Sequence, residues 1–267
     1  MYAKVILDSI SPIGSRLTTI EVKHHRFIIQ ELLTHRVFSR NSSSSRAIPV
    51  SRYIESVRED PAIPIQWGTK QRGMQAGPPL ENGAAKSAEL QWRRALENAL
   101  DAASILDQMG VHKQITNRLL DPFAWNTMII SSTEWENFFR LRCSPLAQPE
   151  IEAVAQCIRL VYEASVPQEL DYGEWHTPLI QPDEEFSLQD RKKVSVARCG
   201  RVSYLTHAGV RDPDEDLAMF RRLQSAEPPH DSPMEHVATP ATPGEIEAHN
   251  VKGNFGTFHQ LRHTGIA

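Results

Sequence analysis

The sequence predicts an α/β protein in which strands and helices share a core. Apolar and polar residues alternate over residues 2–8 and 17–23, the pattern of strands with one buried face. Residues 125–131 form a short apolar run that is typical of a fully buried strand. Apolar residues recur at helical spacing over residues 84–109 and 147–165. The chain therefore contains both kinds of element, and its 40% of hydrophobic residues can supply a core for them.

Turn and loop residues divide the N-terminal part of the chain. Residues 11–14 contain serine, proline and glycine and predict a turn between the first two strands. Residues 27–38 predict a short helix that runs into a serine-rich segment. Residues 55–83 are predicted to be loop-rich, because proline and glycine gather at 61–83.

A long helix is predicted after this loop. Asn82 is its expected N-terminal cap, and Gly110 is its expected stop. One face of this helix is apolar and is predicted to pack on the core, through Trp92, Ala95, Leu96, Ala99, Ala103 and Leu106.

The second half of the chain is predicted to be mostly helical. Ser132 or Thr133 is the expected cap of the helix that follows the strand at 125–131. A Pro-rich connection at residues 177–183 separates this body from the last third of the chain, and the tail from residue 253 fits no single pattern. The other predicted helices cover residues 112–123, 132–142, 190–204 and 212–226.

Charge and cysteine content exclude several classes of protein. The net charge of −4 differs from that of general nucleic-acid binders, which are usually basic. Cys143, Cys157 and Cys199 lie far apart, which indicates neither a disulfide framework nor a zinc site and fits a reducing compartment. The N-terminus does not resemble a signal peptide, and no apolar run has the length of a membrane span. We expect a cytoplasmic protein without a bound metal.

One segment, Leu33–Arg52, stands out from this acidic background. It contains six serines and four arginines, and no acid occurs between Glu31 and Glu55. Two interpretations are open. The segment could be a flexible serine linker, or it could form an anion site in which hydroxyls, backbone N–H groups and guanidinium groups face phosphate.

Other catalytic signatures do not occur in the sequence. No GxSxG, HExxH, GxxxxGK[ST] or GxGxxG pattern is found. Cys143 beside Arg142 is the most suggestive nucleophile, but no neighbouring histidine supports it. Any nucleotide must therefore be held by arginine and polar side chains and by helix N-termini. The candidates are Arg36, Ser44, Ser45, Arg46, Arg118, Asn137 and Arg142.

Three groups of residues decide between these interpretations. The first is His35-Arg36, followed after seven residues by Ser44-Ser45-Arg46. The second is NFFRLRCSPLAQPE, Asn137–Glu150. The third is split between GRVSY, Gly200–Tyr204, and HDSPMEH, His230–His236. Together they resemble the Arg-His-Arg triplet, the Asn…Leu-Arg…Ala-Gln-x-Glu segment, and the Arg-Val-Ser and Ser-Pro-Phe-Glu-His motifs of the flavin-dependent thymidylate synthases.

The order of these motifs differs from that of the family. There the Arg-Val-Ser and Ser-Pro-Phe-Glu-His motifs precede the triplet, whereas here they follow it. We interpret this order as a circular permutation of one domain spanning residues 1–267, with the FAD-binding motifs carried by residues 196–267. The resemblance implies an α/β fold with a mixed sheet flanked by helices, and a homotetramer with active sites between subunits.

The resemblance also assigns roles to single residues. Arg142 would face the pyrimidine ring and favour ionisation at its N3, and Arg142 and Ser44 are the expected catalytic residues. The nucleotide phosphate would be held by Ser44, Ser45, Arg46 and Arg118. FAD would be held by Thr34, His35, Arg36, Val37, Asn137, Ser203, His230, Ser232 and Glu235.

Three positions depart from the family pattern. Thr34 stands where the triplet has its first arginine, and we expect Arg262, from the tail segment QLRH, to replace it. Ser42 stands where an acid near the nucleotide is usual, and Glu31 stands where a nucleotide-contacting glutamine is common. Because a carboxylate accepts from an exocyclic amine while a uracil O4 needs a donor, these changes keep dCMP open as a substrate beside dUMP.

The reaction that the resemblance implies is a transfer of a one-carbon unit from methylenetetrahydrofolate to C5 of a deoxypyrimidine monophosphate. FAD would be the cofactor and NADPH the reductant. Conversion of dUMP to dTMP is the first expectation, because it is the usual reaction of the family, and conversion of dCMP to 5-methyl-dCMP is the alternative. More remote alternatives are a catalytically silent flavin or nucleotide sensor and a nucleic-acid-binding module.

Overall fold

The computed structural model describes residues 1–202 and 212–265. At its centre lies a five-stranded sheet with the strand order β3-β4-β2-β1-β5. Neighbouring strands are antiparallel except β5, which pairs with β1 in parallel. The predicted α/β fold with a mixed sheet is therefore confirmed. The strands are β1 (Tyr2–Ile10), β2 (Arg16–His25), β3 (Ser39–Ser42), β4 (Trp125–Ser132) and β5 (Gln168–Glu169).

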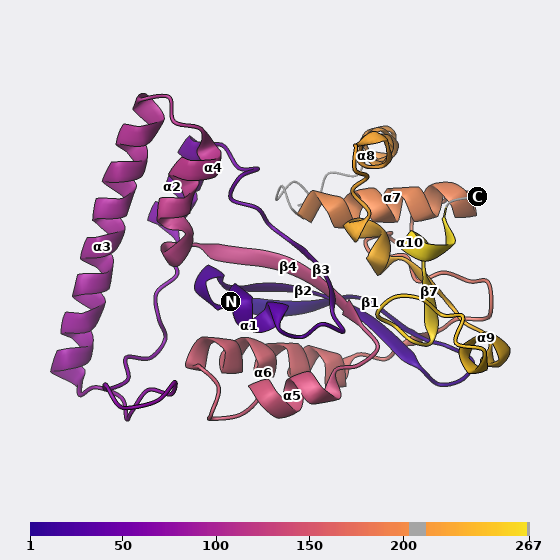
Figure 1. Cartoon of the computed structure of the whole chain (residues 1–267), viewed down its shortest axis with the longest axis horizontal. Coiled ribbons are helices and arrows are strands. Elements are labelled where there is room, and N and C mark those ends of the chain that lie inside the picture. Colours follow the sequence, from indigo (N-terminus) through magenta and orange to yellow (C-terminus); the bar gives the residue numbers. More distant parts are fainter. Residues whose placement is uncertain (203–211, 266–267) are drawn as a thin grey trace.

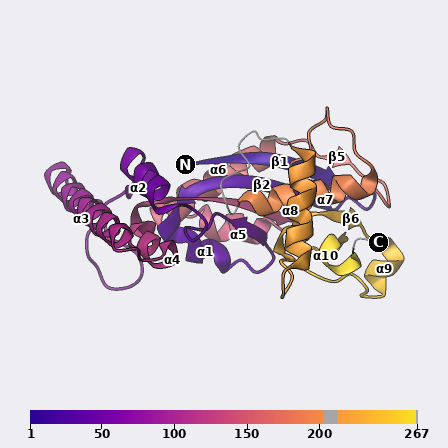
Figure 2. The same cartoon turned by 90° about the horizontal axis from the view of Figure 1, so that it is seen from above.

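Helices lie on both faces of the sheet and at one of its ends (Figures 1 and 2). One face carries α5 (Glu136–Arg142) and α6 (Pro149–Ala164), and the other carries α7 (Leu188–Arg201) and α8 (Pro213–Ser225). The end of the sheet is occupied by α2 (Val50–Glu59), α3 (Asn82–Gln108) and α4 (Lys113–Thr116). No helix in the described part of the chain is long and apolar enough to cross a membrane.

Shorter elements complete the fold. The five-residue helix α1 (Ile29–Leu33) follows β2 and leads into β3. A two-stranded sheet of β6 and β7 lies near the C-terminus, next to α9 and α10. The bounds of these last elements are β6 (Ala238–Pro240), α9 (Pro243–Glu247), β7 (Phe258–Gln260) and α10 (Leu261–Thr264).

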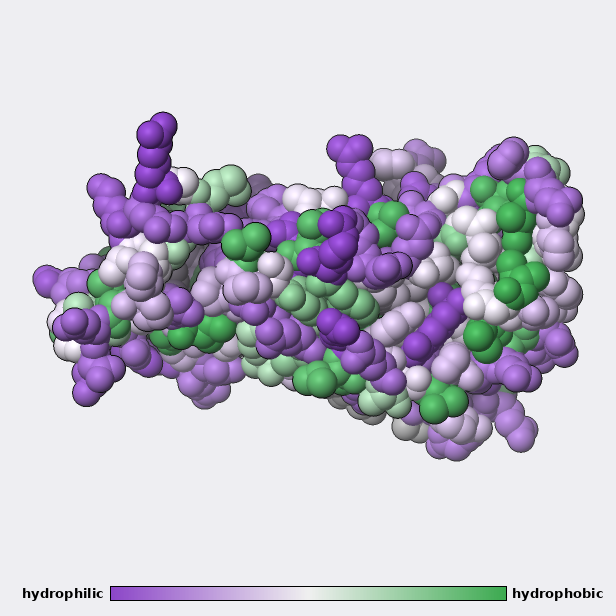
Figure 3. All heavy atoms as spheres, turned by 90° about the horizontal axis from the view of Figure 1, so that it is seen from below, coloured by the Kyte–Doolittle hydropathy of each residue, from purple (hydrophilic) through white to green (hydrophobic). Residues whose placement is uncertain are grey.

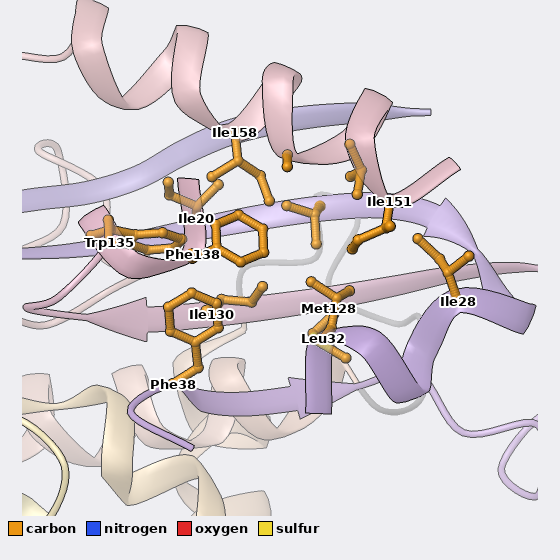
Figure 4. Close-up of a cluster of buried hydrophobic side chains, with 13 residues drawn as sticks. Ile20, Ile28, Leu32, Phe38, Met128, Ile130, Trp135, Phe138, Ile151 and Ile158 are labelled. Carbon is orange, nitrogen blue, oxygen red and sulfur yellow. The ribbon is translucent and has the colours of Figure 1, made fainter. Parts of the chain in front are cut away.

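The main core fills the space between the sheet and the helices α5 and α6. Ile20 of β2 and Met128 and Ile130 of β4 meet Phe138 of α5 and Ile158 of α6, all with 1% exposure or less. Their side chains point toward one another across this layer (Figure 4). Full burial of one such side chain contributes about 1.5–3 kcal/mol, so this layer fixes where α5 ends relative to α1.

The opposite face of the sheet mixes apolar and polar contacts. Ile129 packs against Cys199 of α7, which explains why β4 is apolar on both faces. Two buried histidines contact this face: His236, from the C-terminal third, bonds Ser131 at 2.8 Å, and His176, whose backbone pairs with Ala238, bonds Thr19 at 2.8 Å. The C-terminal third is therefore held to the centre of the sheet by buried hydrogen bonds, which are stronger at low dielectric than bonds exposed to water.

Several predicted boundaries were wrong in detail. The helix predicted at 27–38 is a 3₁₀ turn at Arg26–Ile28 followed by α1, and it ends at Leu33 because the chain then forms β3. The segment predicted as loop-rich from residue 55 is helical as far as Glu59, the end of α2. Helix α5 begins at Glu136, because Ser132 is still paired within β4.

The long helix shows two further differences. Asn82 is its first helical residue and not its cap, and the cap residue Glu81 makes no side-chain bond to the helix. Ala95, predicted to face the core, is exposed, while Leu100 is fully buried. Gly110 follows the helix with a φ of +78°, a conformation that favours glycine, and thus confirms the predicted stop.

Candidate active site

The end of α5 meets the end of α1 through the side chain of Arg142. Its Nε donates to His35 Nε2 at 3.0 Å, and its Nη2 donates to Thr34 Oγ1 at 3.0 Å and to the carbonyl of Glu31 at 3.3 Å. A guanidinium group presents its donors in a rigid fork, so three acceptors fix both its position and its plane. The structure thus brings together four of the predicted site residues, although they come from segments more than 100 residues apart.

His35 is neutral in this arrangement. It is 6% exposed, and its Nε2 can accept from Arg142 only when that nitrogen carries no proton. Burial, together with the charges of Arg142 and Arg40, lowers the pKa of His35 from 6.5 to about 4. The motif resemblance assigned His35 to the flavin contacts, whereas in the structure its Nε2 accepts a hydrogen bond from Arg142 and so orients that side chain.

Glu31 has an unsatisfied side chain. The residue is half-buried, and its Oε2 is covered yet has no hydrogen-bond donor among residues 1–202 and 212–265. Arg142 contacts the backbone carbonyl of Glu31, and no ion pair with its carboxylate is formed within the described chain. An ionised carboxylate can only accept hydrogen bonds, so this group is suited to a ligand that donates.

The serine segment is part of the sheet and is held in place. β3 pairs with β4, and Ser42 and Ser43 both donate to Asn126 Oδ1, at 3.0 and 3.1 Å. Asn117 Nδ2 donates to the carbonyl of Ser45 at 2.7 Å. The linker interpretation is therefore wrong, because both the strand and the turn after it have fixed partners.

The predicted phosphate contacts differ in their exposure. Ser44 is half-buried and Arg46 is exposed, whereas Ser45 is 1% exposed and its Oγ has no partner in the described structure. Arg118 is exposed and forms an ion pair with Asp121 at 2.9 Å. Arg118 directly follows Asn117, so it lies next to the segment that this asparagine holds.

The second part of the candidate site surrounds the 3₁₀ turn Ser232–His236. His236 Nε2 lies 3.3 Å from Asn41 Oδ1, which places this turn beside β3. Glu235 forms an ion pair with Arg262 of α10. The tail, the turn and the serine strand therefore meet at one place, although they are far apart in the sequence.

Gln260 and Arg40 connect the turn Ser232–His236, β3 and the end of α1. The motif resemblance assigned a role to neither residue. The buried Gln260 donates from Nε2 to Ser39 Oγ at 2.9 Å and to the carbonyl of Glu235 at 2.8 Å. Arg40 Nη1 donates to the carbonyls at the end of α1, the shortest bond being 2.9 Å to Leu33. Burial lowers the pKa of Arg40, and the nearby Glu235 carboxylate opposes this shift. The only sequence signal was that Arg40 belongs to the arginine-rich stretch and Gln260 to the tail motif.

Several predicted cofactor contacts point to solvent. Arg36, His230 and Ser232 are exposed, and within the described residues their side chains form no hydrogen bond to the rest of the site. Asn137 is exposed, and its Oδ1 accepts from Arg140 at 2.8 Å. Val37 packs against the main core, and Ser203 lies outside the described residues.

Possible metal ligands and the Cys143 thiol lie as follows. No group of three or more His, Cys, Asp or Glu side chains in residues 1–202 and 212–265 is arranged to hold a metal ion. Burial raises the pKa of the Cys143 thiol, although Arg142 is its chain neighbour. The site described above is built from guanidinium, imidazole, hydroxyl and carboxylate groups.

Comparisons with known proteins give the following relatives. Two solved structures of the UMP/dUMP methylase PolB from Streptomyces cacaoi are similar to the chain. One of them, bound with 5-Br dUMP, is 18% identical to this chain, with a TM-score of 0.43. The match covers 56% of this chain and 66% of the PolB chain, so this chain spans about two thirds of the length of that structure. The other, bound with 5-Br UMP, is 14% identical and has a TM-score of 0.47 over 61% of this chain and 88% of the other. A search of curated proteins finds no significant match.

A family model matches a continuous segment of the chain. The model of the family described as "thymidylate synthase complementing protein", Thy1, matches residues 9–168, which is more than half of the 267 residues. The match includes α1, β3 and Arg142, and it ends before the motifs at 200–204 and 230–236. The chain therefore belongs to the thymidylate synthase complementing protein family, that of the flavin-dependent thymidylate synthases which its motifs resemble.

Proposed function

We propose that the protein is a flavin- and folate-dependent methylase that acts on C5 of a deoxypyrimidine monophosphate. The observation that carries this proposal is the joining of Arg142 to Glu31, Thr34 and His35 inside the segment that matches the family. Two motifs that the family uses for nucleotide chemistry thus form one rigid unit. Family membership favours dUMP as the substrate and dTMP as the product.

The chain's own residues would divide the work as follows. Arg142 has its Nε and Nη2 occupied, and no described residue accepts from its Nη1, so Nη1 remains for the pyrimidine. A cation held there lowers the energy of negative charge that develops on the ring. Ser44, Ser45 and Arg46 follow β3 and would hold the phosphate, with Arg118 beside them. The rigid strand β3 would thus set the distance between the phosphate and the base.

The residues near Ser232–His236 fit a flavin in chemical type. Ser232 and His230 are exposed and make no side-chain hydrogen bond to the site within the described residues, and Arg40 and Arg262 supply two cations beside the Glu235 carboxylate. This donor set suits the phosphates and the polar ring edge of FAD. When bound, FAD would supply hydride chemistry, with NADPH as reductant and methylenetetrahydrofolate as one-carbon donor.

We further propose one domain with a permuted motif order, assembled as a homotetramer. The packing of the turn Ser232–His236 against β3 supports the permutation, because it places the C-terminal motif beside the triplet. Large exposed apolar residues, Leu141, Leu146 and Leu160, lie on or between α5 and α6. The surface on that side shows several apolar patches separated by polar residues (Figure 3). Light scattering of the purified protein tests the assembly.

An anaerobic turnover assay tests the proposed activity. Purified protein is supplied with FAD, NADPH and methylenetetrahydrofolate, dUMP and dCMP are offered separately, and the products are identified by mass. We expect methylation at C5 in wild type and a loss of about 100-fold in the Arg142→Lys variant, since lysine cannot serve three acceptors and still face the ring. Bound flavin without turnover would instead indicate the silent sensor, and absence of flavin binding would favour the nucleic-acid-binding module.

A further inference from the structure

We propose that Glu31 and Arg142 together select a pyrimidine with a 4-amino group, so that the substrate base is cytosine. This inference rests on the proposed function, and for the base bound at that same site it departs from the dUMP that family membership favours. It starts from two residues in contact, one whose side chain has a free donor and one whose side chain has a free acceptor. The N–H groups on Nη1 of Arg142 donate to no described residue. The Glu31 carboxylate accepts from no described residue, and its Oε2 is covered.

The bond between Arg142 and the backbone of Glu31 brings the two residues into contact. Arg142 Nη2 contacts the carbonyl of Glu31 at 3.3 Å, so the guanidinium lies against the residue that carries the carboxylate. Thr34 accepts from the same Nη2, and His35 accepts from Nε of the same guanidinium. His35 is neutral, so it provides no positive charge that could neutralise Glu31. A ligand in contact with both groups meets a donor next to an acceptor.

Cytosine matches this pair without a change of protonation. Its 4-amino group donates and its adjacent N3 accepts, so the amine can bond the carboxylate while N3 accepts from Arg142. A hydrogen bond to a charged group raises affinity by roughly 10- to 150-fold. Glu31 is half-buried, so the amine would meet the exposed part of its carboxylate and not the covered Oε2.

Uracil matches the pair less well. Its O4 is an acceptor, so at the position of the amine it would face the carboxylate with no proton between them. Uracil could instead turn its N3–H toward Glu31. The carboxylate would then oppose ionisation at N3, because a second negative charge at hydrogen-bond distance is unfavourable. Either orientation penalises uracil at the step where Arg142 is expected to act.

Wild-type holoenzyme gives the first test, because no substitution is needed. Titration calorimetry of the FAD-loaded protein is carried out with dCMP, with dUMP, and with the deoxynucleotide of pyrimidin-2-one, which lacks a 4-substituent. We expect dCMP to bind at least tenfold more tightly than the pyrimidin-2-one nucleotide. Because the N3–H and O4 of uracil can also satisfy the carboxylate and the guanidinium, dUMP is distinguished from dCMP by kcat/KM, which should be at least tenfold higher for dCMP. If the pyrimidin-2-one nucleotide binds as tightly as dCMP, the amine is not recognised and the inference is overturned.

The Glu31→Gln variant gives the second test. An amide supplies a donor as well as an acceptor, so we expect the ratio of kcat/KM for dCMP to that for dUMP to fall at least tenfold. Glu136→Gln, the same change at an exposed residue that begins α5, is the matched control and should leave this ratio unchanged. Circular dichroism checks that both variants are folded.

The two proposals fail in different ways. If either nucleotide is methylated but the ratio is the same in wild type and Glu31→Gln, the choice of cytosine is overturned and the methylase activity stands. If the FAD-loaded protein binds and methylates neither nucleotide, both proposals are overturned.

Discussion

Arg142 donates from Nε to His35 Nε2 at 3.0 Å, and this bond joins the end of α5 to the residue that follows α1. Because the histidine is the acceptor, its proton must reside on Nδ1. His35 also packs edge-on against Phe138, with ring centroids 5.0 Å apart, so its ring cannot turn freely. The core thus determines the direction in which Arg142 points.

Replacing His35 by phenylalanine should separate this orienting role from packing. Phenylalanine can keep the ring contacts with Phe38 and Phe138 but offers no acceptor to Arg142. We expect kcat/KM for the nucleotide to fall about tenfold, with a change in the free energy of unfolding below about 1.5 kcal/mol. Steady-state kinetics and urea unfolding of the variant provide both values. An unchanged kcat/KM would show that Arg142 does not depend on His35.

Local sequence patterns could predict the elements whose apolar residues follow a regular period. β1, β2, β4, α3 and α6 are of this kind. β3 could not be predicted, because its four residues are polar and are stabilised by distant partners. Ser39 accepts from Gln260, and Asn41 contacts His236, both from the C-terminal part of the chain.

In the candidate site, too, some features could be predicted from the sequence and others could not. Motif spacing could identify Arg142, His35 and Thr34 as site residues, but it could not show that they bond one another. Those bonds depend on where α5 ends relative to α1, which is set by packing on the sheet. Arg40 was missed for a related reason: it bonds backbone carbonyls of the preceding helix, and no residue pattern encodes that contact.

Stability should decrease at mildly acidic pH because of His176 and His236. Both are fully buried, and burial lowers the pKa of each from 6.5 to about 3. Between these pKa values the unfolded chain binds protons that the folded chain does not. Stability is therefore complete above pH 6.5 and is lost as the pH falls toward 3. At pH 5 the loss is roughly 2 kcal/mol for each histidine.

Urea unfolding at pH 7.5, 6.5 and 5.0 measures this dependence. Glutamine does not titrate in this range. In His176→Gln the free energy of unfolding should therefore decrease between pH 7.5 and 5.0 by roughly 2 kcal/mol less than in wild type, which is the contribution of one histidine. His249→Asn is the control, because His249 is exposed and asparagine tolerates its positive φ of 53°. Equal pH dependence in wild type and His176→Gln would contradict the assignment.

Arg262 should contribute to flavin binding if the tail completes the cofactor site. It forms an ion pair with Glu235 of the turn that would contact FAD, yet its side chain remains 44% exposed. An exposed charge is screened by water, so we expect Arg262→Ala to weaken FAD binding only about three- to tenfold. Flavin fluorescence during titration of the apoprotein measures the affinity. Arg58→Ala, at an exposed arginine of α2, should have no effect. Full FAD affinity in Arg262→Ala would exclude this role.

Thr34 should orient Arg142 through its hydroxyl oxygen. Its Oγ1 donates to the carbonyl of Glu31 at 2.7 Å and accepts from Arg142 Nη2 at 3.0 Å, so one hydroxyl links the helix end to the guanidinium. Valine has nearly the same shape but no hydroxyl, whereas serine keeps the hydroxyl and loses only a methyl group. Thr34→Val should lower kcat/KM for the nucleotide about three- to tenfold, and Thr34→Ser should stay within about twofold of wild type. The residue is exposed, so neither change should alter the free energy of unfolding by more than about 0.5 kcal/mol. If serine and valine reduce kcat/KM equally, the effect comes from the methyl group and not from the bond to Arg142.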